Sequence, residues 1–480
     1  MFTETQGTII GVLVVVYFLL LFGVAVYINK KSIKTYDDYN VAGRTVSIFP
    51  LILTFVGTAI GGSILLGYME NGYNAGMSQQ WINVGILSTG VIMAGFLAKK
   101  IRAIGAKHNM VTIGDFTALR YGEAARIPTV ICVLLAYCAI TGMQFVAIAT
   151  ILNLTMGIGM TAGILISWLM LTAKTYIGGL KAVIWQDAVH GTIQTVGVFI
   201  LFFVILYASG GFNQISANVN AAGAGDMLVP HFSGGEMLVF FFTLGAYQLV
   251  RQDLWQRFWA AKNENIAIKG YWASIIVGFL VGVVVVATGV YARYGLGLEN
   301  INPTFVYYEA ANAVFGFPML VIMIVALMAT VISCADSFFM AGSSSIINDI
   351  VKPRMKNASD KQMLQYSRFS VIVVSIIAVL LALYMPQLVT LWVTGTAMLV
   401  AGLLAPVVLG LYWKRITRAA GIAAMWFGLV IAVVWQIAGH PFGIHPVFIG
   451  LPVSIATIVL FTLLAKEEEE TAVLSKAKAN

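Results

Sequence analysis

The feature that most constrains this chain is a series of apolar runs, each long enough to cross a lipid bilayer. A spanning helix needs about 20 predominantly apolar residues. The 480 residues contain thirteen such runs, near 8–29, 47–69, 81–98, 127–152, 159–176, 182–208, 237–256, 271–292, 318–347, 369–385, 389–412, 419–438 and 446–465. Because the runs are continuous and do not alternate with polar residues, they predict helices and exclude the strands of a membrane barrel. We therefore expect an all-α membrane protein with 13 transmembrane helices.

The composition excludes the main soluble classes. Hydrophobic residues make up 60% of the chain and charged residues 10%, whereas soluble domains carry roughly 25% charged residues. A soluble enzyme or a nucleic-acid-binding protein would need more polar surface than this chain supplies. The cysteines, Cys132, Cys138 and Cys334, lie in apolar runs and show neither disulfide nor metal-site spacing. We expect a lipid bilayer around the chain, no organic cofactor, no nucleic-acid partner and a functional monomer.

The basic residues predict one orientation. If the N-terminus is outside, nearly all of the 28 Lys and Arg residues fall in or beside inside loops, and Arg293 alone falls outside. Lys174 lies at the edge of the third inside loop, and Arg251 and Arg257 lie in the fourth. Because cytoplasmic loops collect Lys and Arg, we expect the C-terminus inside. The first run lacks a basic flank and a cleavage site, so it is a retained helix, and the short loops indicate the plasma (inner) membrane of a prokaryote.

Three ionisable residues interrupt the apolar runs. Asp187 opens the sixth run three residues before His190, and Asp336 lies within the ninth run. Ionisable groups inside a membrane are costly, which makes each one a candidate for ion binding or gating. The alternative is a hydrogen-bonded carboxylate that only locks two helices together. His190 is better explained as a packed, hydrogen-bonded residue than as a proton carrier.

The second run is rich in glycine, with Gly57, Gly61 and Gly62 close together. One interpretation is close helix packing through a small-xxx-small face. The other is a helix that breaks in the middle of the membrane, which is tolerated where the unwound backbone lines a cavity or is buried in protein. The freed carbonyls of such a break are suited to ions and substrate. The glycines alone leave both interpretations open.

Two hydroxyl residues in the ninth run add a second candidate element. Thr330 and Ser333 are spaced i, i+3 and therefore share one face of a helix. A hard cation such as Na⁺ prefers oxygen ligands, which these hydroxyls and the carbonyls of a broken neighbouring helix would supply. Such hydroxyls also commonly bond to their own helix, so the pair is weak evidence when taken alone.

Four stretches together resemble the sodium:solute symporter family, whose carriers include those for proline, pantothenate, sialic acid, sugars and choline. The stretches are 37–44 (DDYNVAGR), 178–187 (GGLKAVIWQD), 252–262 (QDLWQRFWAAK) and 329–337 (ATVISCADS) with 343–349 (SSSIIND). The resemblance runs along nearly the whole chain.

The resemblance implies a LeuT-type fold of two inverted five-helix repeats. It divides the chain into 1–45 (an extra helix and the first cytoplasmic loop), 46–208 (core helices 1–5), 209–235 (an extracellular loop), 236–412 (core helices 6–10) and 413–480 (two additional helices and a tail). Paired helix interruptions are expected of inverted repeats. Gly245 would then mark a break in core helix 6 that matches the one in core helix 1.

The resemblance also implies a sodium site. Its ligands would be the backbone carbonyls of Gly57 and Ile60 together with Thr330 and Ser333. Cys334 stands where the family usually has a second Ser or Thr, and a thiol is a poor ligand for a hard cation. The carry-over places Asp187 and Asp336 at a second ion site or at the inner gate. Because His190 replaces a common Gln, a second sodium is doubtful.

Carried over in the same way, eight residues become candidate substrate contacts midway across the bilayer. They are Thr58, Ala59, Ser63, Tyr137, Gln144, Thr243, Gln248 and Trp392. No Lys or Arg points to a full anion clamp, so a multiply charged anion is not an expected substrate. Aromatic residues near Tyr247 and Trp392 permit a cation–π site for an ammonium ligand, and they fit gate or lipid packing equally well.

We therefore predict a secondary active transporter that uses Na⁺ as the coupling ion for symport of a small organic solute by alternating access. Amino acids, monocarboxylates, vitamins and quaternary amines all remain open as solutes. The alternatives are a proton-coupled carrier on the same fold and a passive facilitator or channel. The chain has no nucleophile–base motif and no metal cluster, so we do not expect an enzyme.

Overall fold

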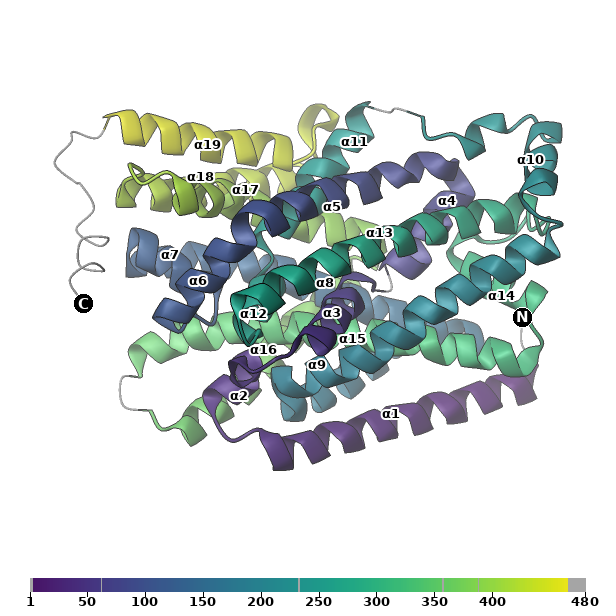
Figure 1. The fold of residues 1–480 in the computed structure, drawn as a ribbon, viewed down its shortest axis with the longest axis horizontal. Helices are drawn as coiled ribbons and strands as arrows, with labels where there is room; N and C mark the ends of the chain where they lie inside the picture. The colour runs from purple at the N-terminus through teal and green to yellow at the C-terminus, as the bar shows by residue number, and fades with distance from the viewer. Residues whose placement is uncertain (1–2, 62, 232–233, 356–357, 387, 465–480) are drawn as a thin grey trace.

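The computed structural model describes residues 3–61, 63–231, 234–355, 358–386 and 388–464, and within these ranges the chain is helical (Figure 1). The one β contact there is an isolated bridge between Val46 and Ala261. Most of the long helices lie side by side along the long axis of the molecule, with the start of the first helix and the end of the last at opposite ends. This is the arrangement that continuous apolar runs predict, because a spanning helix satisfies its own backbone hydrogen bonds.

The α-helices follow one another along the chain with short connections. Their bounds are α1 Glu4–Ser32, α2 Tyr36–Val41, α3 Ile48–Ala59, α4 Met69–Ala75, α5 Gln80–Ile92, α6 Ala98–His108, α7 Ile113–Tyr121, α8 Arg126–Met156, α9 Met160–Ala208, α10 Phe212–Ala221, α11 Gly234–Phe240, α12 Gln252–Ala260, α13 Glu264–Tyr294, α14 Val306–Val314, α15 Phe317–Ser345, α16 Asp360–Tyr384, α17 Leu388–Tyr412, α18 Arg418–Ile437 and α19 Val447–Leu464. The centre is formed where α3 packs on α9 and α13, and where α15 packs on α8 and α9.

Ten helices in the described residues are long and apolar enough to cross a membrane. The count of thirteen therefore stays a prediction, and the difference has a structural origin. The predicted spans 159–176 and 182–208 form the single element α9, which bends sharply at Gly179, where φ is 59°. The predicted spans 47–69 and 237–256 are each divided into shorter helical pieces.

The first of these divided spans contains the predicted break. Helix α3 ends at Ala59, and the backbone is non-helical at Ile60 (φ −96°, ψ 83°) before a π-helical segment begins at Ser63. Gly62 lies outside the described residues. The close-packing interpretation also applies in this span, because α3 packs tightly on α9 at Gly57. A Cβ on Gly57 would lie 3.0 Å from the backbone oxygen of Asp187. The two interpretations of the glycine-rich run thus apply to different glycines.

The second divided span breaks at a different place from the one predicted. The chain is π-helical over Phe241–Gly245 and becomes extended at Arg251 (φ −69°, ψ 114°), where α12 begins. Gly245 does not make this break. A Cβ there would lie 3.0 Å from the backbone oxygen of Gly85, so the missing side chain allows close approach of α5.

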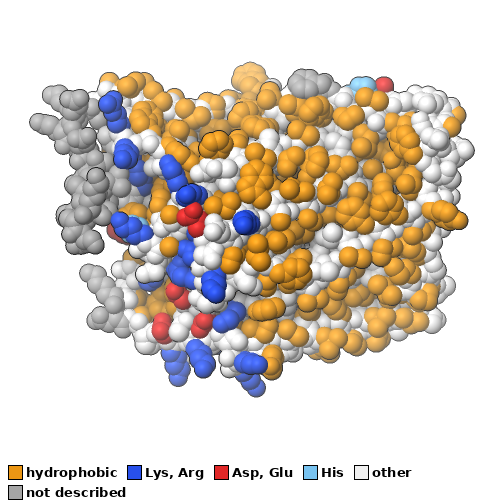
Figure 2. Space-filling model, in the orientation of Figure 1, with side chains coloured by type: hydrophobic (Ala, Val, Ile, Leu, Met, Phe, Trp, Pro, Cys, Tyr) orange, Lys and Arg blue, Asp and Glu red, His pale blue; other side chains and the backbone are white. Residues whose placement is uncertain are grey.

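Charged residues are concentrated at one end of the molecule. On the face shown in Figure 2, the Lys and Arg side chains gather toward the left-hand end, where α1 and α19 end. Hydrophobic side chains cover a broad band of the remaining surface. A polar end beside an apolar belt is the surface expected of a protein that is embedded in a bilayer.

Candidate functional site

The carboxylate of Asp187 lies at the centre of the molecule, fully buried on α9, and hydroxyl groups surround it. From α3, Thr54 Oγ1 donates to Asp187 Oδ2 at 2.6 Å and Thr58 Oγ1 at 3.3 Å. From α15, Ser333 donates to Oδ1, and Ser337 Oγ lies 3.4 Å from Oδ2. Three helices that are distant in sequence therefore converge on one buried carboxylate.

A buried guanidinium completes this cluster. Arg257 on α12 places Nη2 3.1 Å from Asp187 Oδ2 and 2.6 Å from Ser337 Oγ, and its Nε donates to Thr54 Oγ1 at 3.0 Å. The Arg257 side chain is 1% exposed and the Asp187 side chain 0%. Burying either charge alone would be costly, but the pair with its hydrogen bonds is tolerated.

A second buried ion pair continues from the first. Arg257 Nη1 lies 3.7 Å from Asp253 Oδ2, and Arg251 holds the same carboxylate through Nε (3.1 Å) and Nη2 (2.6 Å). Tyr137 on α8 donates to Asp253 Oδ1 at 2.5 Å. Arg251, Asp253, Arg257 and Asp187 thus form a chain of alternating charges with no formal net charge.

The predicted sodium ligands lie beside this cluster. Cys334 Sγ is 3.2 Å from the carbonyl oxygen of Gly57, and the carbonyl oxygen of Ile60 accepts from Gln194 Nε2 at 2.9 Å. Thr330 Oγ1 donates to its own helix, at Ala326 O, at 3.0 Å. In this conformation the carbonyl oxygens of Ile60 and Gly57 therefore accept from Gln194 and Cys334. The sodium site of the resemblance stays a prediction.

The chemistry of the Asp187 cluster fits a hard cation. One carboxylate and the hydroxyls of Thr54, Thr58, Ser333 and Ser337 offer oxygen atoms only, which is the donor set that such ions prefer. The Arg257 guanidinium occupies the same place and supplies the positive charge in the structure. A bound Na⁺ and this guanidinium would therefore compete for Asp187.

Asp336 and His190 have structural partners. Asp336 accepts from Lys174, which is 1% exposed, and from Thr175 Oγ1 at 2.6 Å, so it joins α15 to α9. The geometry favours the helix-locking interpretation of Asp336. The Lys174 ammonium group is buried against α15, and its place at the edge of an inside loop stays a prediction. His190 Nε2 lies 2.7 Å from the hydroxyl of Tyr17, as expected of a packed histidine.

A cavity adjoins the charge chain on the side of α5, α13 and α17. About 760 Å³ of empty space adjoins its lining residues, and this figure includes space that is open to solvent. Four predicted substrate contacts line it, namely Thr58, Ala59, Gln248 and Trp392. Arg251 also lines it and is a basic residue that the list of substrate contacts did not include.

The other predicted contacts do not line this cavity. Tyr137 is not among the lining residues, and its hydroxyl donates to Asp253, which lines the cavity. Gln144 Nε2 lies 3.5 Å from its own helix at Ile140 O, and Thr243 donates to Val239 O at 2.6 Å. The Ser63 side chain lies outside the part of the chain that the structure describes.

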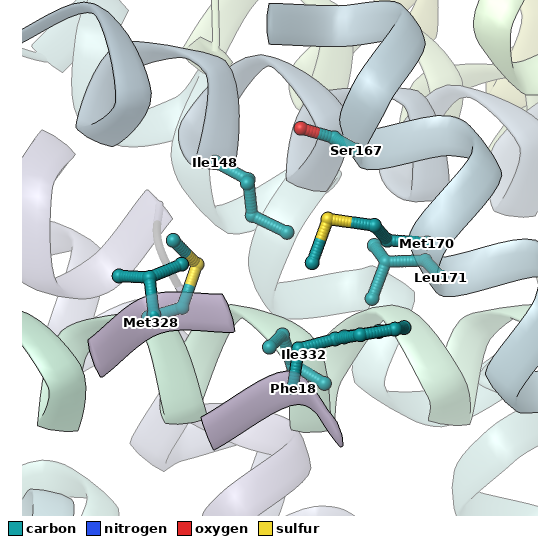
Figure 3. A pocket seen from close by; sticks show the side chains of 8 residues that line it. Phe18, Ile148, Ser167, Met170, Leu171, Met328 and Ile332 are labelled. Carbon is teal, nitrogen blue, oxygen red and sulfur yellow. The ribbon is translucent and has the colours of Figure 1, made fainter. Parts of the chain in front are cut away.

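A second cavity lies between α1, α8, α9 and α15 (Figure 3). About 240 Å³ of empty space, a figure that includes open solvent, adjoins its lining residues, and the side chains of Phe18, Met170 and Met328 point into it. Its only polar lining residue, Ser167, donates to Gly163 O of its own helix at 2.6 Å. A cavity without a free polar group offers an organic ion or a polar solute nothing to bind, so we do not assign the solute to it.

Three functional candidates were not expected from the sequence. Arg251, Asp253 and Arg257 are close together in the sequence, at the end of the predicted span 237–256 and in the inside loop beside it. The structure buries the side chains of all three. The one available signal was the aromatic residues around them, Trp255 and Trp259, which are unusual in an exposed loop.

The chain is similar to characterised transporters along its whole length. A family model described as the sodium:solute symporter family matches residues 39–428. The sodium/pantothenate symporter of Escherichia coli is 25% identical over 492 residues, covering 97% of this chain and 98% of the relative. The sodium/proline symporter of the same organism is 24% identical over 472 residues, covering 95% and 93%.

Solved structures share the fold. A Na⁺-coupled sialic acid symporter in a substrate-bound outward-open state matches with a TM-score of 0.79 at 17% identity, over 96% of this chain and 98% of the other. Mhp1, a nucleobase-cation-symport-1 family transporter, matches with a TM-score of 0.57 at 13% identity, over 88% and 92%. The predicted all-α membrane fold of LeuT type is confirmed.

Proposed function

Because the chain belongs to the sodium:solute symporter family, we propose that the Asp187 cluster binds the sodium ion that drives uptake of its solute from the cavity beside Arg251. The chain is a multi-pass membrane transporter that carries out sodium-coupled symport of a small organic solute, and it is not an enzyme. The observation that carries the proposal is the convergence of hydroxyls from α3 and α15 on one buried carboxylate.

The position of the cluster supports coupling between ion and solute. Thr58 belongs to both sites, since its hydroxyl contacts Asp187 while the residue lines the cavity. It lies two residues before the break at Ile60, so a change at the ion site acts directly on the broken helix. Discontinuous helices at the bilayer midplane are the elements that alternating access rearranges.

Sodium binding by the purified protein tests the ion site without knowledge of the solute. We expect Ser333→Ala to raise the concentration of ²²Na⁺ needed for half-saturation, because it removes one oxygen next to Asp187. Asp187→Asn removes the charge and should weaken binding further. Ser345→Ala is the matched control, because this hydroxyl on the same helix donates to its own backbone at Ala341 O.

An equal effect of Ser333→Ala and Ser345→Ala on ²²Na⁺ binding would contradict the proposal. In proteoliposomes, uptake of labelled proline, pantothenate or sialic acid should exceed equilibrium only with an inward sodium gradient. Accumulation driven by a pH gradient without sodium would favour proton coupling. Sodium-independent equilibration would favour a facilitator.

We propose the same orientation as the basic residues predict, with the N-terminus outside and the C-terminus in the cytoplasm of a prokaryotic cell. The native cysteines Cys132, Cys138 and Cys334 are all buried, which favours a labelling test with introduced thiols. In intact cells, Asn220→Cys in the long outside loop should react with an impermeant maleimide, and Lys361→Cys should react only after lysis. The reverse labelling pattern would indicate the opposite orientation in the membrane.

A further inference from the structure

The lining of the central cavity is almost free of charge. Beside aromatic and aliphatic side chains and the amides of Asn83 and Gln248, its charged residues are Arg251 and Asp253. The two are not equivalent toward a solute, because their hydrogen-bonding capacities are used to different extents. That difference indicates which charge the cavity accepts.

The carboxylate of Asp253 is surrounded by donors. It accepts from Arg251 at both oxygens and from Tyr137 at Oδ1, and Arg257 Nη1 lies 3.7 Å from Oδ2. The backbone nitrogen of Asp253 also bonds to Tyr137, at 3.1 Å, which fixes the carboxylate against α8. An ammonium group in the cavity would find this anion already compensated by two guanidinium groups.

The guanidinium of Arg251 has N–H groups that make no hydrogen bond within the described part of the chain. Its five N–H groups make three hydrogen bonds within the described part of the chain, two to Asp253 and one from Nη1 to Gln248 Oε1 at 3.1 Å. One N–H on Nη1 and one on Nη2 remain, and two N–H groups are the number that a paired contact with a carboxylate uses. The Arg251 side chain is 8% exposed, so the bonds would form in a largely desolvated place.

We propose that the solute carries a carboxylate group and that Arg251 binds it. This inference rests on the proposed function, because it assumes that the cavity is the solute site. The body of the solute would lie against the apolar part of the wall, which includes Phe55, Tyr271 and Trp392. A neutral amide or alcohol of the same shape would leave the Arg251 donors unpaired.

Matched pairs of acids and neutral analogues test this proposal on the purified full-length protein. The pairs are pantothenate with pantothenol and benzoate with benzamide. We measure the dissociation constant of each compound by thermal shift in NaCl and in KCl. At least one acid should bind, and its neutral partner should bind at least about tenfold more weakly, as expected for loss of a bidentate charged contact.

Variants then connect the discrimination to one side chain. In Arg251→Gln the acid and its neutral partner should bind equally weakly. Arg251→Lys keeps the charge beside Asp253 but loses the fork, so it should fold as the wild type does and bind the acid about tenfold more weakly. Arg102→Gln is the control, since Arg102 is also buried but donates to Ala261 O at 3.0 Å, away from the cavity.

Three results would overturn the proposal: no acid binds, a neutral analogue binds as tightly as its acid, or both Arg251 variants keep wild-type discrimination. The ratio of the two affinities distinguishes the loss of a direct contact with the carboxylate from a general structural defect. A structural defect lowers the affinities for the acid and for its neutral partner together. The failure of sodium coupling would look different. Acid binding would then be the same in NaCl and KCl, and ²²Na⁺ would not bind, while the dependence on Arg251 persisted.

Discussion

The ion pair between Lys174 and Asp336 provides a direct test of whether Asp336 is structural. Both side chains are 2% exposed, and within the described part of the chain Asp336 is the one carboxylate in ion-pair range of Lys174. Removing one partner leaves a buried charge uncompensated, which costs about 3–5 kcal/mol, whereas removing both is often neutral. We therefore expect Lys174→Met and Asp336→Asn each to destabilise the protein, and the double variant to recover most of the loss.

The expected change in melting temperature follows from the size of the chain. Globular proteins unfold with an entropy of about 2.1 cal/mol/K per residue, which for 480 residues is about 1 kcal/mol/K. Each single variant should therefore melt about 3–5 °C below the wild type. The assay is tryptophan fluorescence of detergent-solubilised protein at one fixed heating rate, because unfolding of such a protein is irreversible and its apparent midpoint depends on the rate.

Two results would refute this reasoning. If the double variant melts no higher than the weaker single variant, the two groups are not energetically coupled as a pair. If the double variant is as stable as the wild type but no longer shows sodium-dependent uptake, Asp336 or Lys174 takes part in transport beyond locking α9 to α15. Wild-type stability together with wild-type uptake supports a structural role for both residues.

Two further predictions concern single positions. Cys334→Ser puts a hard oxygen in place of the thiol sulfur that now lies 3.2 Å from the Gly57 carbonyl oxygen, and should lower the sodium concentration for half-maximal uptake severalfold. An unchanged value, equal to that of the Cys138→Ser control, would exclude residue 334 as a ligand. Gly72→Ala would place a Cβ 2.2 Å from Val286 O, and should destabilise the packing of α4 on α13 by about 1–3 kcal/mol. The control is Gly23→Ala, where a Cβ meets no atom within 4 Å, and equal melting temperatures of the two variants would refute the prediction.

The sequence predicted helix positions well wherever apolar length was the deciding quantity. The run 271–292 lies within α13, and 419–438 nearly coincides with α18 Arg418–Ile437. Three neighbouring glycines left a break near Ile60 and close packing equally open, and the predicted break at Gly245 was misplaced, because the chain becomes extended at Arg251 before α12. A glycine can allow either a bend in the backbone or the close approach of a neighbouring helix, and the sequence does not show which helix lies beside it. Gly245 allows the close approach of α5.

The sequence predicted only one residue of each of two buried ion pairs. Asp187 and Asp336 were conspicuous because each lies in a predicted span, where an ionisable group is costly. Their partners Arg257 and Lys174 lie at the ends of apolar runs, where the rule for basic residues assigns them to a cytoplasmic loop. The residues of each pair are 70 and 162 positions apart, so no local pattern joins them.

The charge balance of the site gives a physical reason for coupled binding. Asp187 and Asp253 are compensated by Arg257 and Arg251, so a sodium ion that enters alone adds a positive charge to a neutral, buried cluster, which the low dielectric makes unfavourable. A carboxylate that enters with it restores neutrality. If the proposed sites are correct, a carboxylate bound to Arg251 would weaken the hold of Arg251 on Asp253, and Asp253 would then attract Arg257, now 3.7 Å away, more strongly. Asp187 would become available to sodium, and each ligand would lower the cost of binding the other.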